Sequence, residues 1–362
     1  MKITRLVQKT IALPLANPIP SARTIIRSIN CVLVYLQTDE GLIGEGIAFT
    51  LNGHRLSVIA EMIRTLEPLV IGIEPQMSGK FWLDAWHDIS FIGRNGVAVM
   101  GLAAIDAALW DLRGKAANLN VSCLIGRCRD RVPVYRSNGL RLSASIDELQ
   151  QEARSFVEQG FRAVKMSLGM PSAAADVARV RAVREAIGPG VALMTDCNQQ
   201  FSTAQAIRRG RMLEEFDLGW IEEPVSALDH AGEAEVAAML DTPVASGENA
   251  FTRLGILEMI RQRSADILMP DLQRMGGPTE LLKVAAIADG FNIPVSPHLF
   301  TEMTVPLAAS ISNANYAEYM VWFQDLYGQA IELDDKGRAI VSDAPGWGRS
   351  FSAAAVERFA LD

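Results

Sequence analysis

Seven ionisable side chains stand at the ends of short apolar runs in the second half of this 362-residue sequence. In chain order they are Lys165, Asp196, Glu222, Glu248, Asp271, His298 and Glu318. Successive members lie 20 to 31 residues apart, which is the length of one strand and its following helix in a barrel. Parallel strands would therefore bring them to one mouth. Ionisable groups are costly to bury unless they pair or bind metal, so these residues are candidates for a catalytic site.

Three of the carboxylates, Asp196, Glu222 and Glu248, end consecutive predicted strands. Grouped carboxylates repel one another and need a cation, and oxygen ligands without His or Cys favour Mg²⁺ over zinc. Asn198 follows Asp196 by two residues, points to the same side of an extended segment and could support the site. Glu223, beside Glu222, is interpreted as a supporting residue rather than a ligand. The alternative is three independent salt bridges, which would have to recur at three strand ends.

Asp271 and His298 end the next two predicted strands. A carboxylate beside an imidazole orients the ring and favours its protonated form, which suits a general acid or base. Lys165 would supply positive charge to an anionic substrate, although an ion pair with the metal-site acids is also open. Glu318 faces across the barrel and, if protonated, could donate a hydrogen bond to a developing oxyanion.

An alternation of strands and helices from residue 132 onward positions these residues. Eight strands are expected between residues 132 and 321. The intervening helices are expected over 147–159, 172–187, 203–215, 230–240, 253–262, 278–289 and 301–312. This succession indicates a closed parallel barrel rather than a doubly wound sheet, which normally carries a phosphate loop after its first strand. Arg136, Ser137 and Asn138 end the first barrel strand, where contacts to substrate hydroxyls and structural contacts are both open.

The first third of the chain has a different pattern. Residues 1–50 are expected as strands and residues 55–125 as helices. The run 41–46 has the spacing GxxGxG rather than the nucleotide-binding GxGxxG, so it is interpreted as a β-hairpin. Asp106 and Asp111 lie on a predicted helix and are interpreted as structural or interface carboxylates rather than ligands.

Composition excludes several classes of function. The formal net charge is −8 with no basic block, which argues against nucleic acid and anionic membranes as partners. The four cysteines form no CxxC pair with the spacing of a zinc site, and so few cysteines in a chain of this length indicate reduced thiols. No apolar stretch has the length of a membrane span, and the N-terminus lacks the apolar core of a signal peptide. We therefore expect a cytoplasmic protein, and the positive charge of Lys165 at the mouth favours a small anionic substrate such as a small-molecule carboxylate.

Eight strings occur in an order and spacing that together are highly specific. They are TDEGLIGEG, AAIDAALWDLRGKA, VKMS, DCNQ, WIEEP, SGEN, MPDLQRMGG and SPH. With them the chain resembles the enolase superfamily, mandelate racemase subgroup (mandelate racemase/muconate lactonizing enzyme-like proteins). The resemblance implies an α/β fold in which a modified (β/α)7β TIM-like barrel over residues 129–340 carries the site. It also implies an α+β N-terminal capping domain over residues 1–128, completed by about 341–362.

The resemblance also implies a chemistry. It implies Mg²⁺ on Asp196, Glu222 and Glu248, a dyad of Asp271 and His298 on one side of the substrate, and Glu318 near a substrate carboxylate oxygen. Cap loops near residues 15–28 and 49–55 would close over the mouth and select the substrate. Homo-oligomers from dimer to octamer are common in the subgroup.

One position departs from the subgroup. A Lys-x-Lys pair commonly ends the second barrel strand, and its second lysine is the base opposite the histidine. Here the string is Lys165-Met166-Ser167, and an unactivated hydroxyl is too weak a base for a carbon acid. We therefore predict an Mg²⁺-dependent lyase that dehydrates a sugar acid, an aldonate or aldarate, to a 2-keto-3-deoxy acid. A racemase, epimerase or cycloisomerase is the alternative, and a non-catalytic metal-binding relative comes third.

Overall fold

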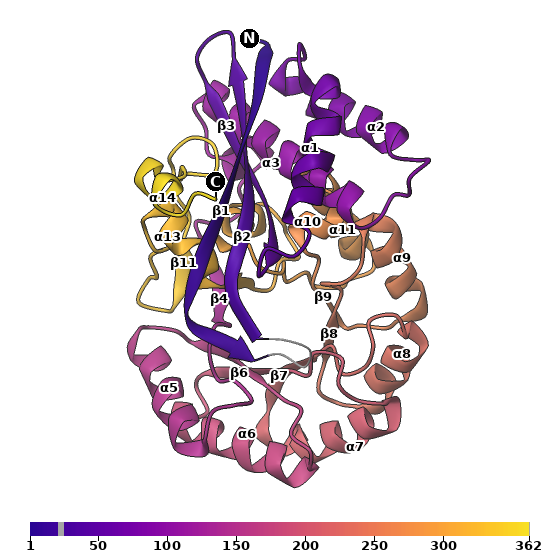
Figure 1. The fold of residues 1–362 in the computed structure, drawn as a ribbon. Coiled ribbons are helices and arrows are strands. Elements are labelled where there is room, and N and C mark those ends of the chain that lie inside the picture. Colours follow the sequence, from indigo (N-terminus) through magenta and orange to yellow (C-terminus); the bar gives the residue numbers. More distant parts are fainter. Residues whose placement is uncertain (21–24, 362) are drawn as a thin grey trace.

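Short apolar strands that alternate with helices form a parallel sheet that curls into a barrel (Figure 1). The computed structural model describes residues 1–20 and 25–361. The strand order in this sheet is β10, β4, β5, β6, β7, β8, β9, with β11 antiparallel on β4. The bounds are β4 Arg131–Arg136, β5 Ala163–Ser167, β6 Ala192–Asp196, β7 Leu218–Glu222, β8 Val244–Ser246, β9 Ile267–Leu268, β10 Ala317–Tyr319 and β11 Arg338–Ile340.

The seventh expected strand, residues 292–298, is present only as isolated bridges. Val295 pairs in parallel with Leu268 on one side and with Ala314 on the other, which joins the β9 side of the sheet to the β10 side. The segment contains Pro294 and Pro297, which carry no N–H and so interrupt a regular ladder. The barrel closes through this segment, and the predicted fold class is confirmed.

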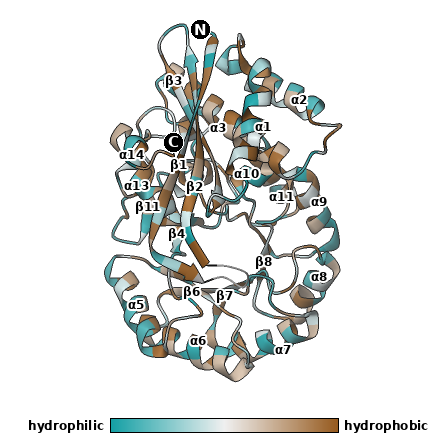
Figure 2. Ribbon diagram, viewed as in Figure 1, coloured by the Kyte–Doolittle hydropathy of each residue, from teal (hydrophilic) through white to brown (hydrophobic). Residues whose placement is uncertain are grey.

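The seven expected helices lie within four residues of their predicted bounds, and helices cover the outside of the barrel. They are α5 Ile146–Glu158, α6 Ala173–Ile187, α7 Thr203–Leu213, η2 Glu214–Phe216, α8 His230–Met239, α9 Thr252–Gln262, α10 Leu272–Met275, α11 Pro278–Gly290 and α12 Thr301–Ala308. In α5, Leu149, Ala153 and Phe156 are buried, at the spacing of one helical face. Figure 2 shows hydrophilic residues along the outer faces of α5 to α8.

The cap consists of a three-stranded antiparallel sheet backed by helices (Figure 1). Its elements are β1 Ile3–Pro20, β2 Ile25–Thr38, β3 Ile43–Leu51, α1 Leu56–Val70, η1 Pro75–Met77, α2 Ser78–Asp88, α3 Val97–Ala117 and α4 Val121–Ile125. The α3 helix is buried along most of its length because the cap sheet, the other cap helices and the barrel surround it. Among the described residues, no helix is both long enough and apolar enough to cross a bilayer.

The glycine run is a hairpin, as predicted, and two of its glycines allow β3 to approach α3. A Cβ on Gly46 would collide with the carbonyl oxygen of Ala104, and a Cβ on Gly44 would collide with that of Ala108. These glycines therefore serve helix–sheet packing.

We expect Gly46→Ala to lower the free energy of unfolding by about 3 kcal/mol, because the added methyl group meets backbone rather than a movable side chain. The matched control is Gly79→Ala on α2, where a Cβ meets open space; it should change stability by less than about 1 kcal/mol. Thermal and urea unfolding followed by circular dichroism would measure both. Equal effects would show that the β3–α3 approach is not tight in solution.

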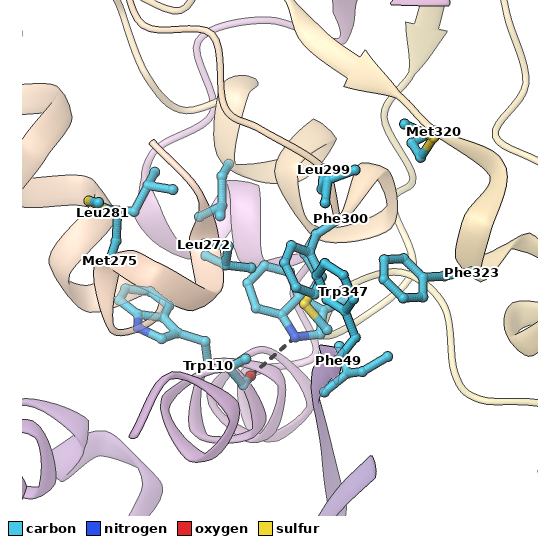
Figure 3. Close-up of a cluster of buried hydrophobic side chains, with 14 of the residues drawn as sticks. Phe49, Trp110, Leu272, Met275, Leu281, Leu299, Phe300, Met320, Phe323 and Trp347 are labelled. Carbon is cyan, nitrogen blue, oxygen red and sulfur yellow. Dashed lines mark hydrogen bonds between the residues drawn. The ribbon is translucent and has the colours of Figure 1, made fainter. Parts of the chain in front are cut away.

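One hydrophobic cluster joins the cap to the barrel (Figure 3). Phe49 and Trp110 of the cap pack with Leu272, Phe300 and Trp347. Both helix carboxylates predicted to be structural lie at this junction, fully buried. Asp106 accepts hydrogen bonds from the Thr279 N–H (2.8 Å) and hydroxyl (2.7 Å), and Asp111 accepts one from the Trp347 N–H (2.9 Å).

The C-terminal segment returns to the cap. It comprises η3 Val321–Phe323, α13 Gln324–Tyr327, β11 and α14 Ala353–Arg358. The Leu361 N–H donates to the carbonyl of Thr10, and the Ala12 N–H donates to the carbonyl of Phe359, each at 2.9 Å. The domain limits at 128/129 and 340/341 themselves stay a prediction.

Candidate active site

Neighbouring barrel strands bring the candidate residues to one level at their C-terminal ends. Ser167 on β5 is in register with Asp196 on β6, and Asp196 is in register with Glu222 on β7. Further round the ring, Asp271, which follows β9, pairs in parallel with His298 of the next segment. The spacing in the sequence therefore predicted correctly that these residues share one mouth.

Lys165 lies among the carboxylates. Its Nζ is 2.8 and 3.0 Å from the two carboxylate oxygens of Glu222, 3.3 Å from Asp196 and 3.4 Å from Glu318. Burial alone lowers the pKa of Lys165, but these carboxylates raise it well above its usual value. The ammonium therefore stays charged at the centre of the seven strand-end residues, a cluster that we call the chamber.

The imidazole of His298 completes the network. Its Nδ1 is 2.9 Å from Asp271, and its Nε2 is 3.2 Å from Glu248 and 3.9 Å from Glu318. Burial opposes a charge on the ring, yet Glu248, Glu318 and Asp271 outweigh it and raise the pKa of His298 to about 10. All seven predicted strand-end residues are thus connected by contacts in one chamber.

Asp271 is held as the orienting member of the dyad. It is fully buried, caps the short helix α10 by accepting the Arg274 N–H at 2.8 Å, and lies 3.6 Å from the Arg274 guanidinium. Burial raises its pKa, but Arg274 and His298 together bring the pKa below its usual value. The ionised Asp271 holds the Nδ1 side of the His298 ring, so the other ring nitrogen, Nε2, faces the chamber.

The donor set fits Mg²⁺ in type. Asp196, Glu222 and Glu248 supply only oxygen ligands. Burial, together with repulsion from Asp196, Glu248 and Glu318, raises the pKa of Glu222 well above its usual value although Lys165 opposes this, so a further cation is favoured. Within residues 1–20 and 25–361, however, no three His, Cys, Asp or Glu side chains converge closely enough to hold a metal. Asp196 and Glu222 are turned to Lys165 and Glu248 to His298, so these side chains would have to rotate to hold Mg²⁺.

Glu318 differs from the expectation of a protonated donor. Its carboxylate accepts the Leu299 N–H at 2.7 Å and a hydrogen bond from the Ser137 side chain. Burial raises its pKa, but Lys165 and His298 outweigh burial and lower the pKa below its usual value. Glu318 is ionised in this arrangement and would have to gain a proton before it could donate one.

The supporting residues lie beside the acids. The Asn198 N–H donates to Asp196 at 2.9 Å, whereas Glu223 accepts from Asn249 (2.7 Å) and Gln199 (2.9 Å). Burial and the charge of Glu248 raise the pKa of Glu223 to about 8. Glu223 is thus held by two amides adjacent to the chamber.

At the end of β4, the structure does not bring Arg136 to the site. Its guanidinium packs 5.2 to 5.6 Å from the ring centroids of Phe156, Phe161 and Tyr319, outside the barrel. Asn138 accepts a hydrogen bond from Arg141 at 3.0 Å. Of the three residues at this strand end, Ser137 is the one whose side chain reaches the site, where it donates to Glu318. The signal was available, because side chains alternate along a strand and Tyr135 belongs to the barrel interior.

Comparison with known proteins agrees with this geometry. Residues 4–126 match the family "Mandelate racemase / muconate lactonizing enzyme, N-terminal domain", and residues 148–355 match "Enolase C-terminal domain-like". The chain is 32% identical over 346 residues to L-talarate/galactarate dehydratase of Salmonella typhimurium, which covers 94% of this chain and 86% of that protein.

Two further relatives are informative. The chain is 34% identical over 288 residues to 3,6-anhydro-alpha-L-galactonate cycloisomerase of Streptomyces coelicolor, covering 79% of each chain. The crystal structure of L-talarate dehydratase from Polaromonas sp. JS666, complexed with Mg and L-glucarate, superimposes with a TM-score of 0.95 at 35% identity, covering 100% of this chain and 98% of that one. The strand-end residues, the two matching domains and these relatives together show that the chain belongs to the mandelate racemase/muconate lactonizing enzyme subgroup of the enolase superfamily.

Proposed function

We propose that this enzyme is an Mg²⁺-dependent lyase that dehydrates an aldonate or aldarate to a 2-keto-3-deoxy acid. The observation that carries the proposal is the one-sided chamber: a single imidazole, His298, faces the carboxylates, and Ser167 stands where a second lysine base would be. Similarity to a talarate/galactarate dehydratase over most of the chain supports the same class.

In this proposal Asp196, Glu222 and Glu248 hold Mg²⁺, which supplies electrostatic stabilisation to the substrate carboxylate as charge develops on it. A neutral His298 takes the α-proton at Nε2, and Asp271 fixes the ring through Nδ1. Of the neighbours that raise the pKa of His298, Glu248 contributes most. A cation bound by Glu248 would offset its charge and lower the pKa of His298, so that the ring could act as a base at neutral pH.

His298 then returns the proton to the departing β-hydroxyl, so that water leaves and the enol product tautomerises to the 2-keto-3-deoxy acid. Lys165 provides positive charge for the substrate carboxylate. Glu318 gains a proton when the substrate carboxylate binds beside it, since a neighbouring negative charge raises the pKa of a carboxyl group. The chamber is lined or supported by Asn198, Glu223, Asn138 and Ser167. Arg136 instead packs against aromatic rings outside the barrel and has a structural role.

A panel of aldonates and aldarates with Mg²⁺ in D₂O tests the proposal. We expect at least one acid to lose one water and give a 2-keto-3-deoxy product, detected by mass spectrometry and by a carbonyl-specific assay. Exchange of the α-proton on both faces without loss of water would contradict it and would indicate racemisation or epimerisation.

A cycloisomerase is the second candidate, and the 34% identity to such an enzyme favours including it. It also needs an α-proton to be removed, but the product keeps the mass of the substrate. A panel that includes sugar-acid lactones and anhydro acids separates the two, because an isomerised product of unchanged mass excludes dehydration for that substrate.

We further propose a cytoplasmic homo-oligomer, with the cap over residues 1–128 and 341–362 and the barrel over 129–340. Apolar surface on the cap supports self-association. Ile92, which is 67% exposed, lines a groove of about 570 Å³ together with Val58 and Met62, and the preceding residue in the chain, Phe91, is 98% exposed. Multi-angle light scattering that gave a monomer mass would contradict the oligomer.

A further inference from the structure

The far end of strand β1 reaches from the cap to the barrel mouth (Figure 1). There the guanidinium of Arg141, on the loop between β4 and α5, donates to the carbonyl oxygens of Asn17 and Pro18, each at 3.3 Å. Among residues 1–20 and 25–361, these are the hydrogen bonds by which the segment 13–20 contacts the barrel domain. Leu15 and Ile19 add apolar packing.

The loop that carries Arg141 is fixed to the site. The Ser167 N–H donates to the carbonyl of Leu140 at 3.0 Å, so this loop lies directly beside the end of β5. The Leu140 N–H is held by Glu152 at 2.7 Å, and the buried Arg179 donates to the carbonyl of Arg141 at 2.7 Å. Arg141 therefore projects from an anchored loop rather than from a free one.

The side chain of Arg141 is oriented as well. Its second terminal nitrogen donates to Asn138 Oδ1 at 3.0 Å while the first reaches β1. A planar guanidinium can satisfy acceptors on two sides at fixed angles, which the point charge of a lysine cannot do. The acceptors on β1 are backbone carbonyls, so the contact depends on the path of β1 and not on its side chains.

We propose that Arg141 is a positioning residue that latches the far end of β1 onto the loop beside Ser167 and thereby helps to select the acid that the chamber accepts. The role of Arg141 in selecting the acid rests on the proposed function, whereas the latch itself does not. Arg141 belongs to neither the proposed metal ligands nor the Asp271–His298 dyad, so its loss leaves the reacting groups in place.

Hydrogen–deuterium exchange on the free enzyme tests the latch without any substrate. In Arg141→Ala, amides of residues 13–19 should exchange about tenfold faster, as expected for the loss of a charge-assisted pair of hydrogen bonds. Residues 3–12 should be unchanged. Arg141→Lys keeps the charge and the long stem but should show most of the same increase. Arg181→Ala, which removes an exposed guanidinium paired with Glu215 on the outer helices, is the matched control and should show none.

Steady-state kinetics on the acids turned over in the panel test the selection. Arg141→Ala should raise KM about tenfold with kcat within twofold, and should change the ratio of kcat/KM between acids of different length. Unchanged exchange over residues 13–19 would overturn the latch. Faster exchange with unchanged KM and unchanged preference would overturn the role in selection. If no acid of the panel reacts, the proposed function fails and the exchange result still decides the latch.

Discussion

His298→Asn is expected to lower kcat by about a thousandfold or more, because it removes the only imidazole that faces the carboxylates in the described chamber. Asn can keep the hydrogen bond to Asp271 but cannot take a proton from carbon. The loss should appear in kcat and kcat/KM together, since the group acts in the chemical step. Initial rates on the acid identified by the panel would measure it.

Two variants make this result specific. His230→Asn, the same change at the start of α8, where the ring contacts Glu233 at 3.4 Å, should retain full activity. Asp271→Asn should give an intermediate loss, because it leaves the ring present but without the carboxylate that fixes it. If His298→Asn kept more than about a tenth of wild-type kcat, another group would be the base and the one-sided mechanism would be wrong.

Sequence reasoning predicted that these residues converge because barrel geometry converts sequence spacing into spatial proximity. Once one βα unit occupies 20 to 31 residues, strand ends such as Asp196 and Glu222 must share one mouth, and the observed register places them side by side. The GxxGxG spacing predicted the glycine hairpin, and helical periodicity placed Asp106 and Asp111 on a helix as structural or interface carboxylates. Each of these inferences needs only local periodicity and the rule that parallel strands align their ends.

What the sequence did not predict depends on orientation and charge balance. Arg136 and Ser137 are neighbours, and successive side chains of a strand point to opposite faces of the sheet. Which of the two faces inward therefore depends on the register of β4, and a list of strand-end residues does not contain that information. The protonation of Glu318 depends on Lys165 and His298 at close range, which no spacing rule gives. The irregular seventh strand follows from Pro294 and Pro297, which are visible in the sequence and argue against a regular ladder within an otherwise apolar run.

The contact between Arg141 and the cap is another feature that the sequence did not predict. Its acceptors are backbone carbonyls more than a hundred positions away in the chain, so no side-chain pattern marks them. In this fold the barrel supplies the reacting groups through a regular repeat, whereas the cap meets the mouth through backbone contacts that no repeat or motif marks. Substrate identity is therefore the least predictable property from motifs alone, and variants at that contact are more informative about it than variants at the strand ends.

Glu222→Gln is expected to weaken Mg²⁺ binding by more than the roughly 10–100-fold that loss of a residue supporting a metal ligand costs. Glu222 is the most buried of the three proposed ligands, and burial together with repulsion from Asp196, Glu248 and Glu318 raises its pKa well above its usual value. Gln keeps the size and one oxygen but removes the charge. Isothermal titration with Mg²⁺ alone measures the affinity, independently of any substrate.

Glu223→Gln is the matched control, because it is the same substitution at the next residue. The carboxylate of Glu223 is already held by Asn249 and Gln199, so its loss should weaken Mg²⁺ binding at least tenfold less than Glu222→Gln does. Circular dichroism of both variants would show that the barrel is folded. Equal losses would mean that the site responds to total negative charge rather than to ligation by Glu222, and the assignment of Glu222 as a ligand would then be wrong. A loss confined to Glu222→Gln would show that, of these two adjacent buried carboxylates, the one in register with Asp196 binds the cation.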